Sequence, residues 1–246
     1  MPVPSDELDP RTLPILRSLP ASVFVELRNR LYAGVTNAEI RFPYNAAEED
    51  ALTGALGHAL TEPVAVLLQT NDGFFQWRMT SHKLRGRGAG APEKRIGADG
   101  IFQLEVRDEA GAFLVRKGLL FQSKVDWRGT DRRLLDQTVN LVQHSSSSIV
   151  IDYTAQGYRA VAAIDVITAD GDRRLVPRDR DKRLSEVLGD EFAGCTRGDR
   201  GLHWDELREQ LIIHGEQPSD LVPSHLISMG IQRLQGIPER SREPRI

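Results

Sequence analysis

Apolar residues recur with helical spacing in the first quarter of the chain. A segment that begins just after residue 45 carries leucines four residues apart, which places them on one face of a helix. These apolar positions are Leu52, Leu56 and Leu60. Asn45 can cap this helix, and Glu48 and Glu49 suit the positive end of its dipole. A further helical stretch at 22–32 lies in a segment rich in leucine and proline.

Segments rich in β-branched and aromatic residues follow, and this composition is typical of strands. The pattern predicts strands at 64–69, 74–79, 101–106, 118–125, 149–153 and 161–167. Trp77 in the second strand is expected in the core. Residues 108–111 read Asp-Glu-Ala-Gly and predict a hairpin turn between the third and fourth strands. A helix is predicted at 131–143.

The last third of the chain is predicted to be charged and then helical. Residues 168–183 are expected at the surface, and helices are expected at 204–214 and 224–234. Strands that alternate with helices after a hairpin indicate a mixed central sheet flanked by helices, an α/β fold of the α+β kind. We divide the chain into a helical N-terminal segment (1–45), a core (46–168) and a helical C-terminal extension (169–246).

Composition excludes several classes of protein. The chain has 246 residues, 40% of them hydrophobic and 27% charged, as in an ordinary globular protein. Its net charge of -3 argues against a uniformly basic coat for nucleic acid, but a local basic rim would suffice. The single cysteine, Cys195, permits no internal disulfide. The sequence shows neither a membrane-spanning run nor a signal peptide, so we expect a cytoplasmic protein without a membrane partner.

An acid, an amide and a lysine are predicted to converge at one end of the sheet. Asp99 stands just before the strand at 101–106, and Gln122 and Lys124 close the strand at 118–125. Two antiparallel strands joined by a hairpin bring these ends together. Gln122 and Lys124 share one strand face because side chains alternate with period two. Such a set suits a metal ion held against a phosphate.

These motifs resemble those of the PD-(D/E)XK, or restriction-endonuclease-like, nucleases. The first half of the motif is Gly97-Ala98-Asp99, and the second is Gln122-Ser123-Lys124, as in the subgroup with glutamine in place of the second acid. The helix that starts near Glu48 fits the family's N-terminal acidic helix. Gln137 fits a glutamine often found after the third core strand. The resemblance covers roughly residues 46–166, and it implies a restriction-endonuclease-like core.

The resemblance implies a hydrolase that depends on Mg²⁺ or Mn²⁺. Asp99 would be the central metal ligand, joined by the side-chain carbonyl of Gln122, the backbone carbonyl of Ser123, and Glu49. Lys124 would orient or deprotonate the attacking water, or place positive charge on the scissile phosphate. Glu48 is an alternative to Glu49, and Gln137 could support the site or serve as an ordinary helix residue.

A glycine-rich basic stretch at 81–95 leads into Asp99. Its charges can contact nucleic-acid phosphates above the site, or the stretch can be a solvated linker. The basic residues are Lys83, Arg85, Arg87, Lys94 and Arg95. The glycine spacing matches neither a dinucleotide fingerprint nor a Walker motif.

Three functions remain open on the sequence. The first is a metal-dependent endonuclease that hydrolyses DNA, with a role in bacterial anti-phage defence that rests on the resemblance alone. The second is a catalytically silent protein of the nuclease fold that binds nucleic acid or scaffolds a defence complex. The third is an enzyme held inactive until a partner defence protein arrives or the chain forms a homo-oligomer. The histidines show no HExxH spacing and the serines no Gly-x-Ser-x-Gly elbow, so other hydrolase classes are disfavoured.

Overall fold

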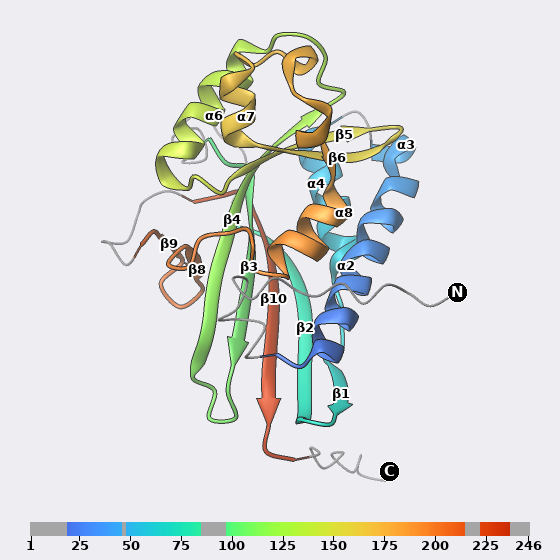
Figure 1. Ribbon diagram of the computed structural model, residues 1–246, viewed down its shortest axis with the longest axis vertical. Coiled ribbons are helices and arrows are strands. Elements are labelled where there is room, and N and C mark those ends of the chain that lie inside the picture. Colours follow the sequence, from blue (N-terminus) through green and yellow to red (C-terminus); the bar gives the residue numbers. More distant parts are fainter. Residues whose placement is uncertain (1–18, 46–47, 85–96, 215–221, 237–246) are drawn as a thin grey trace.

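A large mixed sheet with helices on both faces dominates the computed structural model, which describes residues 19–45, 48–84, 97–214 and 222–236 (Figure 1). The eight strands lie in the order β1-β2-β10-β3-β4-β5-β6-β7. The pairs β10–β3 and β4–β5 are parallel and the others antiparallel. The predicted fold class is therefore confirmed.

The strand bounds agree with the pattern through the first half of the chain. The first six strands are β1 (Val66–Thr70), β2 (Gly73–Lys83), β3 (Gly100–Arg107), β4 (Phe113–Val125), β5 (Ile149–Thr154) and β6 (Gly157–Ala162). A short β7 (Lys182–Arg183) forms one edge of the sheet. Strand β2 continues to Lys83, so the irregular stretch predicted from residue 81 begins later than expected. Trp77 is buried as predicted.

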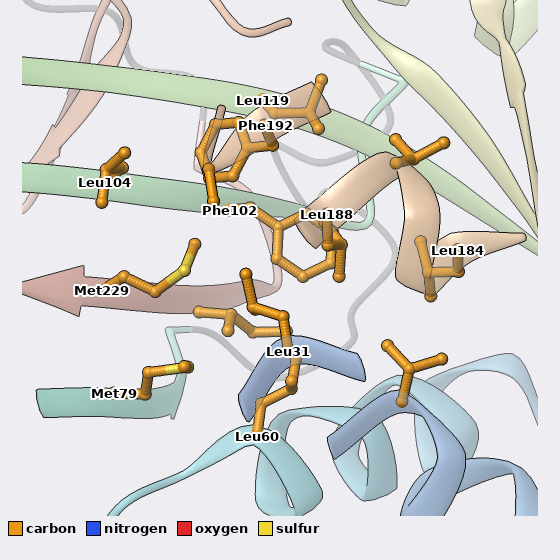
Figure 2. Packing of buried hydrophobic residues seen from close by; sticks show 14 of the residues in the cluster. Leu31, Leu60, Met79, Phe102, Leu104, Leu119, Leu184, Leu188, Phe192 and Met229 are labelled. Atoms are coloured by element: carbon orange, nitrogen blue, oxygen red, sulfur yellow. The ribbon is translucent and has the colours of Figure 1, made fainter. Parts of the chain in front are cut away.

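One face of the sheet packs against helices from two distant parts of the chain. They are α2 (Ala21–Ile40), α3 (Phe42–Asn45), α4 (Glu49–Leu60), α8 (Leu184–Glu186) and the π-helix η4 (Val187–Phe192). The predicted leucine stripe of α4 is fully buried. Figure 2 shows this core, in which Leu31 and Leu60 face Met79 and Met229 of the sheet.

The predicted cap of α4 is wrong. Asn45 belongs to α3, and Glu48 stands at the N-cap position of α4 without a capping hydrogen bond from its side chain. The helix therefore starts three residues later than the best capping residue suggests, at Glu49, whose carboxylate lies in the first turn.

The other face of the sheet is covered by α6 (Arg132–His144) and α7 (Ala163–Thr168). The prediction of a strand at 161–167 is wrong, because β6 ends at Ala162 and a short helix follows. Ala163 and Val166 are buried three residues apart, while Ile164 is half exposed, which is a helical pattern. The β-branched residues of this segment favoured a strand, but packing decided otherwise.

The charged segment at 168–183 is only partly at the surface. It contains the short 3₁₀ helices η2 (Arg173–Leu175) and η3 (Arg178–Arg180). Asp172 and Val176 are buried, so the prediction of an exposed tail is wrong at these positions.

The predicted C-terminal helices are strands. Residues 203–214 form a small hairpin of β8 (His203–Asp205) and β9 (Gln210–Ile212), and β10 is His225–Leu234. Ile227, Met229 and Ile231 are buried in alternation with more accessible neighbours, a period-two pattern that is typical of a strand.

Strand β10 lies between β2 and β3 in the middle of the sheet (Figure 1). The described part of 169–246 therefore contains a central strand of the sheet in addition to the helices α8 and η4. Among the described residues, no helix is both long and apolar enough to cross a membrane.

Candidate active site at the end of the sheet

The hairpin of β3 and β4 brings the two halves of the predicted motif together. Gly100 pairs with Phe121, so Asp99 lies beside the segment from Gln122 to Lys124. The backbone of Asp99 is held on both sides, since its N–H donates to the Phe121 carbonyl and its carbonyl accepts from the His225 N–H of β10. Three neighbouring strands therefore fix the position of this one carboxylate.

The Asp99 carboxylate is hydrogen-bonded through a single oxygen. Its Oδ2 accepts from Gln122 Nε2 at 2.7 Å, from the Ser123 backbone N–H at 2.8 Å and from Ser123 Oγ at 2.5 Å. Among the described residues, no hydrogen bond reaches Oδ1. Burial raises the pKa of Asp99 above its usual value, although the bonds from Ser123 and Gln122 act in the opposite direction. The site thus holds an acid that ionises less readily than a free one and has one oxygen available.

Gln122 presents its amide nitrogen to Asp99. Nε2 also lies 3.3 Å from the Ser123 backbone carbonyl, so the amide stands between two oxygens that would repel each other without it. Gln122 Oε1 is buried and has no hydrogen-bond partner. A buried carbonyl oxygen without a hydrogen bond lowers the stability of the fold by about 1–3 kcal/mol. Such groups are rare in proteins, and a bound ion or water is one way in which they are satisfied.

Lys124 is held between carboxylates from two helices. Its Nζ lies 3.2 Å from Asp131 Oδ2 and 3.8 Å from Glu49 Oε1, and its side chain is only 13% exposed. Burial raises the pKa of Glu49; the charge of Lys124 opposes the rise and that of Asp99 adds to it. Burial acts in the same direction on Asp131, but the Leu134 N–H and Lys124 outweigh it, so the pKa of Asp131 is lowered.

The two predicted supporting residues, Glu48 and Gln137, lie in different surroundings. Glu49, rather than Glu48, is the helix acid near Lys124, and Glu48 is exposed. Gln137 has a buried side-chain oxygen without a hydrogen-bond partner. Its backbone carbonyl lies so close to Gly97 that a Cβ there would come within 2.2 Å of it, and Gly97 has a φ of +69°. Glycine at 97 therefore lets the chain pass α6 on its way to Asp99.

The predicted nucleic-acid contacts are described at one position only. Lys83 ends β2, is half exposed, and forms an ion pair with Asp50 at 2.8 Å. The other four predicted contacts, Arg85, Arg87, Lys94 and Arg95, lie outside the described residues.

Sequence reasoning missed two residues around the site, Asp131 and His225. Asp131 pairs with Lys124, and it could have been recognised as the N-cap residue of the helix that follows the motif. His225 Nε2 lies 2.9 Å from Asp50 Oδ1, and both line a cavity of about 430 Å³ with Lys83. No sequence signal linked His225 to Asp99, because strand pairing joins them.

A buried tyrosine supports the start of α4. The Tyr153 hydroxyl lies 3.1 Å from Thr53 Oγ1, which in turn donates to the Glu49 backbone carbonyl at 2.9 Å. Burial raises the pKa of Tyr153, so its hydroxyl keeps its proton at neutral pH. This chain of hydrogen bonds connects strand β5 to the turn that carries Glu49.

The donor set of this site consists of oxygen atoms. Within the described ranges, no group of three or more His, Cys, Asp or Glu side chains is arranged to hold a metal ion. Glu49 lies close enough to Asp99 for their charges to interact, and Asp99 is hydrogen-bonded to Gln122 and Ser123. Carboxylate and carbonyl oxygens are the hard donors that Mg²⁺ and Mn²⁺ accept.

No family model, curated protein or solved structure matches this chain. The resemblance to the PD-(D/E)XK nucleases therefore stays a prediction from the motif residues.

Proposed function

We propose that this protein is a metal-dependent endonuclease that hydrolyses phosphodiester bonds of DNA. One observation carries the proposal. The residues named from motif order alone, Glu49, Asp99 and Gln122 to Lys124, lie together at one end of the sheet although they come from three separate elements. A cluster with a raised carboxylate pKa and a nearby cation is typical of a catalytic site.

The donor atoms of the site fit a hard divalent cation. Asp99 Oδ1 is without a hydrogen bond among the described residues, and Gln122 Oε1 is a buried oxygen without a partner. Asp99, Glu49 and the carbonyl oxygens of Gln122 and Ser123 would hold the ion. Gln122 can serve as a ligand only once its amide turns, since its nitrogen now faces Asp99. The Mg²⁺ or Mn²⁺ ion would supply charge neutralisation on the phosphate and a more acidic water.

The side chains of this chain would prepare the reaction. Ser123 and Gln122 fix the direction of the Asp99 carboxylate through Oδ2, which leaves Oδ1 available for the ion. Lys124 carries positive charge at the strand end, where it can stabilise the phosphate or orient the attacking water. The N-termini of α4 and α6 both lie at the site, and their dipoles favour an anionic substrate.

The choice of DNA and the role in anti-phage defence rest on the family resemblance. Lys83, with the basic residues that follow it in sequence, supplies positive charge for phosphate contacts. A second copy of the chain or a partner defence protein could activate the enzyme, and a cytoplasmic location suits its single cysteine.

Plasmid cleavage tests this function directly. We expect supercoiled DNA to be nicked in Mg²⁺ or Mn²⁺, and cleavage to stop in chelator and in the Asp99→Ala/Lys124→Ala variant. Asp136→Asn, at an exposed position of α6, is the matched control and should cleave normally. DNA left intact with every metal, and with candidate partners added, would overturn the proposal.

A second candidate is a catalytically silent protein of the same fold that binds nucleic acid. The observation that favours it is that these groups already have partners within the chain, because Lys124 pairs with both Asp131 and Glu49 and the Gln122 amide donates to Asp99 Oδ2. Calorimetry separates the two candidates. Absence of Mg²⁺ or Mn²⁺ binding, with DNA present, would favour the silent protein.

A further inference from the structure

Lys124 is bound unequally by two carboxylates that begin two different helices. Asp131 is the N-cap residue of α6 and lies 3.2 Å from Lys124 Nζ, whereas Glu49 starts α4 and lies 3.8 Å away. A distance of 3.8 Å permits an ion pair but is too long for a strong hydrogen bond. The ammonium is therefore bound mainly by Asp131.

Asp131 is rigidly placed, and its two oxygens have separate partners. Oδ1 accepts from the Leu134 N–H at 2.8 Å, while Oδ2 faces Lys124. The backbone of Asp131 is fixed as well, because its N–H donates to the Gly171 carbonyl and its carbonyl accepts from the Leu135 N–H. The position of Oδ2 is thus set by the start of α6 rather than by Lys124.

Glu49 has more freedom than Asp131. Its side chain is 38% exposed, and no hydrogen bond to its carboxylate is found among the described residues. Rotation of this longer side chain moves the carboxylate away from Lys124 without disturbing α4. Glu49 can therefore exchange one cation for another, and Asp131 cannot.

We propose that Asp131 is a positioning residue that keeps the Lys124 ammonium in place when Glu49 serves as a metal ligand. The inference rests on the proposed function, since it assumes that Glu49 and Asp99 take up a divalent cation. If Asp131 lost its charge, Glu49 would be the one carboxylate left of the two that pair with Lys124. Lys124 would then compete with the metal ion for Glu49. Asp131 thus limits how strongly the Lys124 ammonium competes with the metal ion for Glu49.

Metal affinity of four proteins tests the inference without reference to activity. Mn²⁺ binding is measured by calorimetry in the full chain, in Asp131→Asn, in Lys124→Met and in the double variant. Asparagine caps helices as well as aspartate, so Asp131→Asn removes the charge and keeps the cap. We expect Asp131→Asn to weaken binding by about three- to tenfold, and Lys124→Met to strengthen it several-fold.

The double variant gives the decisive result. If Asp131 acts through Lys124, the loss caused by Asp131→Asn should vanish in the Lys124→Met background. Asp136→Asn makes the same chemical change at an exposed position of α6 and should leave the affinity unchanged. Asp131→Ser, which is also a good cap, replaces the asparagine variant if circular dichroism shows that the latter is unfolded.

The outcomes separate this inference from the proposed function. If the unaltered protein binds Mn²⁺ and Asp131→Asn binds it equally well, the positioning role is overturned and the nuclease proposal stands. If the loss persists in the Lys124→Met background, Asp131 acts as a remote negative charge, and the inference is also overturned. If the unaltered protein binds no Mn²⁺ with or without DNA, both proposals fall.

Discussion

The carboxylates of two clusters in this protein have pKa values shifted in opposite directions. Glu191 in η4 pairs with two cations, the Lys182 ammonium and Arg197 Nε, the latter at 2.5 Å. Burial works against ionisation there, but the two cations outweigh it and the pKa of Glu191 is lowered. At the candidate site, Asp99 and Glu49 have raised pKa values, since burial outweighs the hydrogen bonds to Asp99 and, at Glu49, the charge of Lys124.

The difference separates a cluster that stabilises the fold from one that costs stability. Glu191 ties η4 to β7 and to the loop that carries Arg197, and each partner is satisfied. Asp99 is held in place as firmly, but it has an unused oxygen and lies near an unpartnered amide oxygen of Gln122. Groups that are fixed yet unsatisfied are found at binding and catalytic sites, where the ligand completes them.

The largest expected effect is on the rate of DNA cleavage, which should depend on Asp99 and not on Glu191. Asp99→Asn should lower metal-dependent DNA cleavage by about a thousandfold, or about 4 kcal/mol of transition-state stabilisation, because the proposed central ligand would lose its charge. Glu191→Gln, the same chemical change in the other cluster, should leave the rate per folded molecule unaltered. Rates of plasmid nicking measure both. An Asp99→Asn protein that retains a tenth of the activity would remove Asp99 from the reaction.

The second prediction concerns stability. Glu191→Gln should lower the free energy of unfolding by about 1–3 kcal/mol, because Lys182 and Arg197 would share a neutral amide in place of a carboxylate. Urea unfolding followed by circular dichroism gives the value. A loss below a few tenths of a kcal/mol would show that this cluster is an ordinary surface ion pair.

The third prediction uses the raised pKa of Asp99. A carboxyl group whose pKa is higher in the folded than in the unfolded protein destabilises the fold when ionised, and this cost vanishes as the pH falls below its ordinary pKa. Asp99→Asn should therefore raise the unfolding free energy at neutral pH, by about 1 kcal/mol, and the gain should shrink in acid. Urea unfolding at several pH values measures the trend. A gain that grows as the pH falls would contradict the assigned direction.

Glu191 should show the reverse trend. Its pKa is lowered in the folded protein, so its stabilising effect is present above its ordinary pKa and is lost as the pH falls through the folded value. The destabilisation caused by Glu191→Gln should accordingly fade in acid. The same urea experiments provide this comparison.

The smallest expected change in metal affinity comes from Gln122→Glu. Gln122→Glu adds a charged oxygen at constant shape, so it should keep or strengthen Mn²⁺ binding, by about threefold. Gln122→Leu should abolish cleavage and leave the fold intact, since the amide that orients Asp99 is lost. Calorimetry and plasmid nicking give the two results. Full cleavage by the leucine variant would remove Gln122 from the site.

The candidate site was more predictable than the fold around it. A hairpin needs only local information, so the positions of Asp99 and Gln122 to Lys124 followed from two strands and a turn. Asp131 was missed because the sequence pattern of a helix N-cap does not show whether its carboxylate also binds a lysine. His225 was out of reach, since its contact with Asp99 depends on the pairing of strands that are distant in sequence.

The C-terminal strand shows why the rest of the fold could not be predicted. In β10 the residues from His225 to Ile231 are buried at every second position, but Met229 and Leu234, which are also common in helices, allowed a helical interpretation. Gly230 weakens a helix and is accommodated in the strand, with open space where a Cβ would stand. Burial between β2 and β3 decided the outcome, and burial is not visible in the segment itself.

The central place of β10 has a consequence for how the chain folds. Strands β2 and β3 are made first, yet neither completes its pairing until the chain has reached residues 225–234. Pairing between such distant segments slows folding, and the partly folded chain exposes unpaired edges until the last strand inserts. Because β10 also donates to the Asp99 carbonyl, the candidate site should become ordered only in this late step. Pulse-labelled hydrogen exchange during refolding should therefore protect the amides of α6 before that of His225.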